Sequence, residues 1–529
     1  MINTYISDDT SSLSLFAGEI ADLIFKEALN RKIDINLIRT GSYGIFNYEP
    51  LVEIENKNGR FFIGPVKESN IIDLFNNNIF SENFNGDFNL KNFNKNGIFY
   101  GKIDDFQELK KQKRLIFKRV GINPPLSLDD YINDGGLSAL KRVINLDSAL
   151  VIDEIKISGL RGRGGAGFPV WIKWDTVLKE KSETKYIVCN ADEGDSGAFA
   201  DRMILEGDPF SIIEGIIIAG ITVGAKNGYI YLRSEYFNAK KRILKALDIC
   251  NDAGLLGNSI LNSGKSFNIS LIVGGGSYVC GEETALLESM ENKRGMVRMR
   301  PPVPAISGLY NKPTVLNNVL TFAYISYILS SCNNITQLAN LDYFNSIGTK
   351  DSKGTMVFQV SGAVKHPGIY EMPMGITLKE LLDLSGGFSD KRSPKAMQIG
   401  GPLGAYFPVN DEFFNLNLSY EGLTQKGGIL GHGGIVVFDE SIDLKHMLLR
   451  TLEFCIDESC GKCSPCRLGS MRIKELTERV LKKQNIDANL EIIGEILNTM
   501  EGLSLCGLGA MLHYPVNSLL KYFNKEILT

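Results

Sequence analysis

Three short apolar runs lie in the middle of the sequence: YIVCN at residues 186–190, GYIYL at 228–232 and ISLIV at 269–273. Such runs are consistent with buried strands. Helical patterns at 210–219 and 239–253 separate them. Short strands that alternate with helices are typical of a parallel sheet covered on both faces. We therefore predict an α/β domain in this part of the chain.

The composition bounds the class of protein. A chain of 529 residues exceeds what one core usually serves, so several domains are expected. The net charge of −4 argues against a dedicated nucleic-acid-binding protein, which would carry a basic excess. The most apolar run, 212–225, is too short to span a bilayer and contains three glycines. No direct membrane span is expected.

Cysteine placement indicates the compartment. The nine cysteines include none before Cys189, and they lack the even count and spacing of a secreted disulfide framework. The N-terminus shows no basic region followed by an apolar run, so no signal peptide is visible. We predict a cytoplasmic protein in which a cysteine cluster binds metal.

The N-terminal region, residues 1–120, mixes helical and strand patterns. An amphipathic helix is predicted at 13–28 and strands at 33–38 and 51–55, the second followed by the turn Asn58-Gly59. The Asn-rich stretch 76–96 is predicted to be a loop. This region is interpreted as a small α/β domain.

Three further domains are expected, at residues 121–345, 346–440 and 441–529. The second of these contains strands and glycine turns and is predicted to be a compact α+β module. The last is helical in period throughout, which favours a terminal helical bundle. The predicted elements of these two domains are strands at 355–360 and 434–438 and helices at 378–384, 444–454, 471–481, 490–499 and 511–523.

A glycine-rich loop, GLRGRGGAGFP at 159–169, precedes the first strand of the α/β domain. Its five glycines let the backbone curl and let a ligand approach closely, and its two arginines suit phosphate. The alternative is a flexible surface loop. The spacing is not the dinucleotide-binding fingerprint that follows a strand, so an ordinary dinucleotide fold is not implied.

Two acidic and polar clusters follow predicted strands. The first is NADEGD at 190–195, and the second is GGGSYVCGEET at 274–284. Each alone is explained by a solvated turn and a helix start. Two of them at strand ends of one sheet favour a shared ligand site. Their carboxylates accept hydrogen bonds from hydroxyls and amides, which leaves phosphate to the glycine loop.

The most specific spacing is CGKCSPC at 460–466, with Cys506 about forty residues later. Three thiolates on a tight turn and one remote thiolate suit a [4Fe–4S] cluster. Zinc is the main alternative, although structural zinc usually takes two paired motifs. Buried structural cysteines are a weaker alternative. Cys455 lies outside the pattern and is interpreted, with Cys189, Cys250, Cys280 and Cys332, as a packing residue.

The combination resembles the family of NADH-oxidising flavoprotein subunits, to which the complex I subunit that carries FMN and one [4Fe–4S] cluster belongs. Relatives occur in NAD-dependent hydrogenases and formate dehydrogenases. The resemblance covers about residue 150 to the C-terminus. It implies a thioredoxin-like N-terminal domain, a Rossmann-like FMN-binding α/β domain, a β-grasp (SLBB-like) domain and a C-terminal four-helix bundle with the cluster. The stretches that carry it are 159–169 with Lys173, 189–195, 274–284, 301–305 leading to 312–319, and 459–466 with Cys506.

The resemblance also implies the site residues. No protein acid or base is implied for hydride transfer, because the flavin captures the hydride. NAD(H) would contact the glycine loop, including Arg163, Gly165 and Gly167, together with Asp195 and Glu283, while Phe168 stacks on a ring. The cluster ligands would be Cys460, Cys463, Cys466 and Cys506. The FMN contacts would be Gly162, Gly164, Lys173, Asn190, Asp192, Glu193, Tyr278, Gly281, Glu282, Asn317 and Asn318.

The sequence departs from the family at a few positions. Thr176 and Val303 stand where complex I relatives place aromatic residues, and Asp195 stands in place of glutamate. The N-terminal region has no cysteine to ligate the [2Fe–2S] cluster that hydrogenase relatives carry there. It therefore looks most like the formate dehydrogenase β subunit.

Three functions are weighed. The first is the NADH:acceptor electron-transfer subunit of a formate dehydrogenase, and the second is the corresponding subunit of complex I or a hydrogenase. The third is a non-catalytic scaffold. The expected partners are other iron–sulfur and catalytic subunits of a multi-subunit oxidoreductase.

Overall fold

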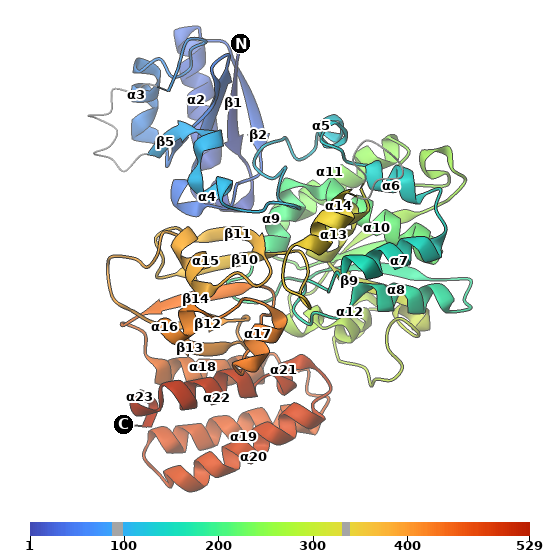
Figure 1. Cartoon of the computed structure of the whole chain (residues 1–529), viewed down its shortest axis with the longest axis vertical. Coiled ribbons are helices and arrows are strands. Elements are labelled where there is room, and N and C mark those ends of the chain that lie inside the picture. The colour runs from blue at the N-terminus through green and yellow to red at the C-terminus, as the bar shows by residue number, and fades with distance from the viewer. Residues whose placement is uncertain (87–98, 331–338, 529) are drawn as a thin grey trace.

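The computed structural model describes residues 1–86, 99–330 and 339–528. Figure 1 shows their arrangement, with the N-terminus and the C-terminus at opposite ends of the long axis. The described residues form three sheets and a terminal group of helices. Among the helices of these residues, none combines the length and the apolar character needed to cross a membrane.

The N-terminal domain, blue in Figure 1, contains a five-stranded sheet in the order β2-β1-β3-β4-β5. β1 is parallel to β2, and the other neighbours are antiparallel. Helix α2 connects β1 to β2 and buries Ile20 and Ile24. This order agrees with the predicted thioredoxin-like fold. The elements are β1 Ile2–Ser7, α1 Thr10–Leu13, α2 Ala17–Arg31, β2 Ile35–Thr40, β3 Val52–Asn56, β4 Gly59–Gly64, α3 Ile71–Asn76, β5 Phe99–Lys102 and α4 Gln107–Lys110.

Three details of this domain differ from the sequence prediction. Strand β1 was missed, because nearly all of its residues are buried and no alternation marks it. The predicted helix 13–28 begins later, because Phe16 adopts a left-handed conformation with φ of 69° and separates α1 from α2. The predicted loop 76–96 follows α3 through turns, and its residues 87–96 lie outside the described residues.

The α/β domain, teal to green in Figure 1, confirms the predicted parallel sheet. Its order is β8-β7-β6-β9, so a fourth strand joins the three predicted ones. β9 was missed, although it carries Asn317 and Asn318. The strands are β6 Tyr186–Ala191, β7 Asn227–Leu232, β8 Asn268–Val273 and β9 Thr314–Asn318. The helices are α5 Leu128–Asn133, α6 Ser138–Val143, α7 Ser148–Ser158, α8 Val170–Lys179, α9 Ala200–Gly207, α10 Pro209–Val223, α11 Phe237–Asp252, α12 Glu283–Met290, α13 Val319–Leu329 and α14 Ala339–Ser346.

Both faces of this sheet are buried, as the apolar runs predict. Ile187 and Cys189 pack into the core that contains the nearly fully buried helices α10 and α13. Val188, between them, points to the other face and joins the core that contains α12 and the C-terminal helices. The three strands β6, β7 and β9 thus lie between two cores, while the edge strand β8 is partly exposed.

The mixed-sheet domain, orange in Figure 1, has the order β11-β10-β14-β12-β13. β10 is parallel to β14, and the other pairs are antiparallel. Helix α15 begins with a capping box formed by Thr377 and Glu380. This agrees with the β-grasp prediction. The elements are β10 Thr355–Gly362, β11 Gly368–Pro373, α15 Leu378–Leu384, β12 Pro394–Ile399, β13 Ala405–Pro408, α16 Asp411–Phe414, α17 Tyr420–Gln425 and β14 Gly434–Asp439.

The helical domain, red in Figure 1, contains four longer helices, as predicted. The second begins at Ser464 and not at 471, because Pro465 suits the first turn of a helix. The short α21 separates Cys506 from the last long helix. The helices are α18 Leu444–Asp457, α19 Ser464–Leu481, α20 Ile486–Leu503, α21 Gly507–Ala510, α22 His513–Tyr522 and α23 Asn524–Leu528.

The mixed-sheet domain contacts all three other domains. A bridge between Ile45 and Gly368 joins it to the N-terminal domain, and Gly165 bridges Gly431 from the α/β domain. On its far side, the Tyr406 amide donates to Ser518 Oγ of α22 at 2.8 Å. The glycine loop therefore lies where the α/β, mixed-sheet and helical domains meet.

Candidate cofactor site

The glycine loop is a structured hairpin. Arg161 and Pro169 form a bridge, and the Gly162 amide donates to Phe168 O at 2.8 Å. A Cβ added at Gly164 would lie 2.8 Å from Asn318 Cβ, which is closer than real side chains approach. Gly164 therefore lets the loop lie directly against the end of β9. The alternative of a flexible surface loop does not describe this segment.

The two arginines of the loop do not supply charge for a ligand, contrary to the sequence interpretation. Arg163 is fully buried, and its guanidinium donates to the carbonyls of Lys353 at 2.7 Å and Thr355 at 3.2 Å. Arg161 donates to Gly167 O at 2.6 Å and pairs with Glu421. Both side chains fasten the loop to the mixed-sheet domain. The Arg163 guanidinium therefore has protein carbonyls for its donors, and a contact of this residue with NAD(H) stays a prediction.

A cavity of about 550 Å³ opens beside the loop, at the carboxyl ends of β6 and β9. This is where open α/β sheets bind ligands. Every predicted FMN or NAD(H) contact except Arg163 lines it. These residues are Gly162, Gly164, Gly165, Gly167, Phe168, Lys173, Asn190, Asp192, Glu193, Asp195, Tyr278, Gly281, Glu282, Glu283, Asn317 and Asn318.

Three asparagine amides in the cavity are fixed by neighbouring groups. Asn190 Nδ2 donates to Gly281 O at 2.8 Å, which joins the two polar clusters. Asn317 Oδ1 accepts from the Trp174 indole at 3.0 Å, and Asn318 Nδ2 donates to Asp201 Oδ2 at 2.7 Å. Side-chain amides both donate and accept, so they match a ligand with ring nitrogens and carbonyls.

The carboxyl groups of the first polar cluster are buried at the cavity wall. Burial raises the pKa of Asp192 and of Glu193 to about 7 in each case. Burial also raises the pKa of Asp195, even though the Tyr278 hydroxyl donates to Asp195 Oδ1 at 2.8 Å. The carboxyl of Asp192 can therefore hold a proton near neutral pH and donate a hydrogen bond to a bound ring.

The second polar cluster contains the charged carboxylate of Glu283. Glu283 pairs with Lys173 and with Arg300, each at 2.8 Å. Burial acts to raise the pKa of Glu283, but the two cations outweigh it and lower the pKa. Glu282 caps helix α12 by accepting from the Thr284 and Ala285 amides. Its other oxygen has no hydrogen-bond partner and lies 3.4 Å from Arg300.

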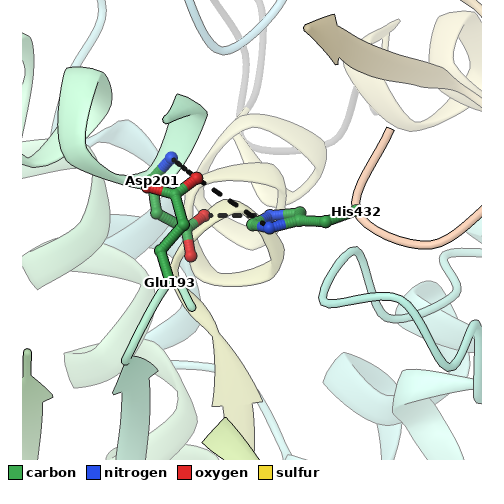
Figure 2. A group of neighbouring side chains, drawn as sticks. All are labelled: Glu193, Asp201 and His432. Carbon is green, nitrogen blue, oxygen red and sulfur yellow. Dashed lines mark hydrogen bonds and ion pairs between the residues drawn. The ribbon is translucent and has the colours of Figure 1, made fainter. Parts of the chain in front are cut away.

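Several cavity residues were missed by sequence reasoning. Asp201 begins helix α9, Arg300 lies beyond α12, and His432 belongs to the mixed-sheet domain. Figure 2 shows Asp201 and His432 beside Glu193. The only available signal was that His432 is one of four histidines and stands between two glycines. Because His432 lies far along the chain from the other motifs, the sequence did not connect it with the cavity.

The four predicted cluster ligands gather at two helix starts. Cys463 is the N-cap of α19, Cys466 lies in its first turn, and Cys506 is the N-cap of α21. Cys460, Cys466 and Cys506 are buried, and Cys463 is partly exposed. Burial is the main cause that raises the pKa of Cys506 to about 12, and the nearby Cys460 and Cys466 add to it. The remote thiol has thus been brought next to the local motif.

The predicted packing cysteines are buried where the structure describes them. Cys189 and Cys250 lie in the core of the α/β domain, and Cys280 and Cys455 lie in the core shared with the helices. Cys455 has an added contact, because a hydrogen bond between Cys455 and Cys466 is the main cause that lowers the pKa of Cys466 to about 6. Cys332 lies outside the described residues.

The cavity and the cysteine site share a wall. Cys506, Leu508 and Met511 line the cavity from the helical domain. The Tyr278 amide donates to Glu458 Oε2, two residues before Cys460, at 3.1 Å. The Tyr278 ring also packs edge-on against Phe454, with centroids 4.8 Å apart. A ligand in the cavity therefore lies beside the cysteines.

Comparison with known proteins defines the class of this site. Residues 155–327 match the model of the Nuo51 FMN-binding domain, and residues 357–403 match the SLBB domain. Residues 446–529 match the NADH-ubiquinone oxidoreductase-F iron–sulfur binding region. The protein is an oxidoreductase subunit with an FMN-binding domain and a [4Fe–4S] region.

Known relatives define the family. The chain is 44% identical over 418 residues to the NADP-reducing hydrogenase subunit HndC of Solidesulfovibrio fructosivorans, covering 79% of this chain and 83% of that one. It is 37% identical over 414 residues to the NADH-quinone oxidoreductase F 2 subunit of Rhizobium meliloti, covering 78% and 96%. The chain belongs to the NADH-quinone oxidoreductase F family of FMN and [4Fe–4S] flavoproteins.

A solved structure extends the likeness to the N-terminal domain. The chain superposes on a chain of an NAD⁺-reducing [NiFe]-hydrogenase with a TM-score of 0.67 and 25% identity, covering 100% of this chain and 84% of that one. Because these relatives are oxidoreductase subunits, the alternative of a non-catalytic scaffold is not supported.

The residues in place fit both cofactors. A volume of about 550 Å³ falls within the range of small-molecule sites. Glu282 Oε1 and Asp201 Oδ1 are buried at the cavity and accept no hydrogen bond, although each lies within ion-pair distance of a cationic or ionisable side chain. Four cysteines in a local triplet with one remote member match the ligand set of a [4Fe–4S] cluster.

Proposed function

We propose that this chain moves a hydride between NAD(H) and FMN in the cavity and moves single electrons between FMN and the [4Fe–4S] cluster. The shared wall of Cys506, Leu508 and Met511 carries this proposal, because it brings the cavity next to the cysteine ligands. FMN, when bound, supplies the conversion between two-electron and one-electron chemistry. The protein supplies position, electrostatics and exclusion of water.

The role of each wall follows from its chemistry. The asparagine amides and the protonatable carboxyl of Asp192 would hold and orient the flavin ring, with Glu193 beside them. Because Gly164 has no Cβ, the loop can lie against Asn318, and its backbone would approach the cofactor closely. Phe168, which is 45% exposed at the cavity mouth, would stack on the ring of NAD(H). Asp195 and Glu283 would contact NAD(H) beside it.

For the partner we propose the catalytic subunit of an NAD-dependent formate dehydrogenase. The absence of cysteine before Cys189 supports this proposal, because the N-terminal domain has no thiolate for a cluster of its own. A hydrogenase is the second candidate. It is favoured by the 44% identity to a hydrogenase subunit and by the full-length likeness to the [NiFe]-hydrogenase chain. We also propose a cytoplasmic location.

The test uses the complex isolated from cells through a tag on this chain. The flavin proposal predicts bound FMN, iron, and NADH-dependent reduction of an artificial dye. Formate-dependent reduction of NAD⁺ by the same complex supports the first partner, and hydrogen-dependent reduction supports the second. A complex with iron but without FMN after reconstitution would contradict the proposed function.

A further inference from the structure

A buried imidazole from the mixed-sheet domain enters the cavity wall of the α/β domain. His432 Nε2 lies 3.2 Å from Asp201 Oδ1, and His432 Nδ1 lies 3.9 Å from Glu193 Oε1. The three side chains are at least nine-tenths buried. Figure 2 shows the ring facing the side chains of Asp201 and Glu193, which lie next to each other. His432 lies beyond residues 155–327, the part of the chain that matches the FMN-binding domain.

One ligand atom from each of these three residues lies within 4.8 Å of the others, a spacing that could also hold a metal ion. Glu193 Oε1 accepts from the Asp201 amide at 3.0 Å, and Glu193 Oε2 accepts from the Arg202 amide and the Tyr236 hydroxyl. Both of its oxygens therefore already have donors. The two ring nitrogens of His432 face different carboxylates, which favours an ion-paired ring over a shared metal centre.

We propose that His432 is a positioning residue of the flavin site, which, as an imidazolium, bridges Glu193 and Asp201 and fixes the Asp201–Asn318 pair at the end of β9. The inference rests on the proposed function, because the cavity must bind FMN. If it is right, the affinity for FMN depends on a side chain of the mixed-sheet domain.

Hydrogen bonds on either side of the ring support the bridge that His432 makes between Glu193 and Asp201. Asp201 Oδ2 accepts from Asn318 Nδ2 at 2.7 Å, so the carboxylate that His432 faces also orients a cavity amide. Gln359 of β10 donates to His432 O at 2.8 Å and accepts from the Ala200 amide at 2.8 Å. Gln359 thus ties the His432 backbone to the start of α9, which carries Asp201.

The electrostatics favour a charged ring. The charged groups that face His432 are Asp201 at the start of α9 and Glu193 and Asp195 after β6. Burial acts to lower the pKa of His432, but these carboxylates outweigh it and raise the pKa to about 9. The imidazolium charge is therefore present at neutral pH, and the stabilisation that it supplies is lost as the pH rises through about 9.

Without the imidazolium, the buried carboxylates of Glu193 and Asp201 repel each other, because its positive charge no longer compensates theirs. Asp201 already acts to raise the pKa of Glu193, and His432 acts to lower it. Breaking a buried charge pair by removing one partner is costly, because the remaining charge stays desolvated. We expect part of that cost to appear as weaker FMN binding.

The experiment measures FMN affinity of the full-length holoprotein at pH 7 and pH 10, by the fluorescence of released flavin. His432→Gln should weaken binding about tenfold at pH 7. The wild type should lose a similar factor between pH 7 and pH 10, and the variant should lose less. The matched control is His446→Gln, whose ring is exposed on α18. Iron content should not change in either variant.

A double variant tests the bridge itself. If His432 acts through Asp201, the loss in Asp201→Asn/His432→Gln should be smaller than the product of the single losses. Equal FMN affinity and equal pH dependence in His432→Gln and wild type would overturn the inference. Stoichiometric zinc or manganese that is lost in His432→Gln would also overturn it. If the variant fails to fold, an FMN affinity of the wild type that does not change with pH decides against the bridge. Wild-type protein that binds no FMN at either pH would instead refute the proposed function.

Discussion

The two sites of this protein are built in different ways. The cysteine site lies within the helical domain, and three of its four ligands fall within seven residues. The cavity next to it is assembled from the α/β domain, the mixed-sheet domain and the helical domain. A local motif can be recognised from its spacing alone, whereas an assembled cavity requires the packing of the domains. We therefore expect loss of one cysteine ligand to abolish cluster assembly. Single changes at the cavity should lower cofactor affinity only in part.

The largest effect is expected at the cysteine site. Cys506→Ala removes the only cluster ligand outside the local motif and should abolish stable cluster assembly, because a [4Fe–4S] cluster needs its thiolates. Iron content should fall from about four atoms per chain to a small fraction. FMN content and NADH-dependent dye reduction should persist, and transfer to partner subunits should stop.

The matched control for this change is Cys250→Ala, which alters a buried cysteine of α11 far from the motif. It should keep its iron. Unchanged iron in Cys506→Ala would show that the ligand set is wrong, and simultaneous loss of FMN would show that the two sites do not assemble independently.

A smaller effect is expected at the cavity. Gly164→Ala places a Cβ 2.8 Å from Asn318 Cβ, so the loop or the end of β9 must shift. Overpacking of this kind costs about 1–3 kcal/mol, which corresponds to roughly a 5- to 150-fold loss of FMN affinity. Flavin binding is measured by titration of the apoprotein. Gly502→Ala, which meets open space in α20, is the control and should bind FMN normally. Wild-type affinity in Gly164→Ala would contradict the close approach.

The smallest effect is expected at the ion pairs of the second polar cluster. Glu283→Gln keeps the shape but removes the charge that holds Lys173 and Arg300. The KM for NADH should rise about three- to tenfold, while FMN affinity changes less, if Glu283 contacts NAD(H) as proposed. Steady-state dye reduction measures the KM. Glu475→Gln, in an exposed pair on α19, is the control. An unchanged KM would remove Glu283 from the NAD(H) site.

The sequence predicted most of the fold and the local parts of the sites. The parallel sheet followed from runs such as YIVCN, and the cysteine site followed from CGKCSPC. β1 was missed because burial removes its alternation, and β9 was missed because its polar end resembles a loop. The surroundings of Arg163 were not predicted, because only the packed structure shows that carbonyls of the mixed-sheet domain take its donors. His432 could not be placed for the same reason.

Anaerobic titration of the isolated holoprotein with NADH tests the central claim most directly, when flavin absorbance and the paramagnetic signal of the cluster are followed together. The wild type should show flavin bleaching and cluster reduction, and Cys506→Ala should show bleaching alone. Flavin absorbance that NADH leaves unchanged in the wild type, or a cluster signal that persists in Cys506→Ala, would contradict the account.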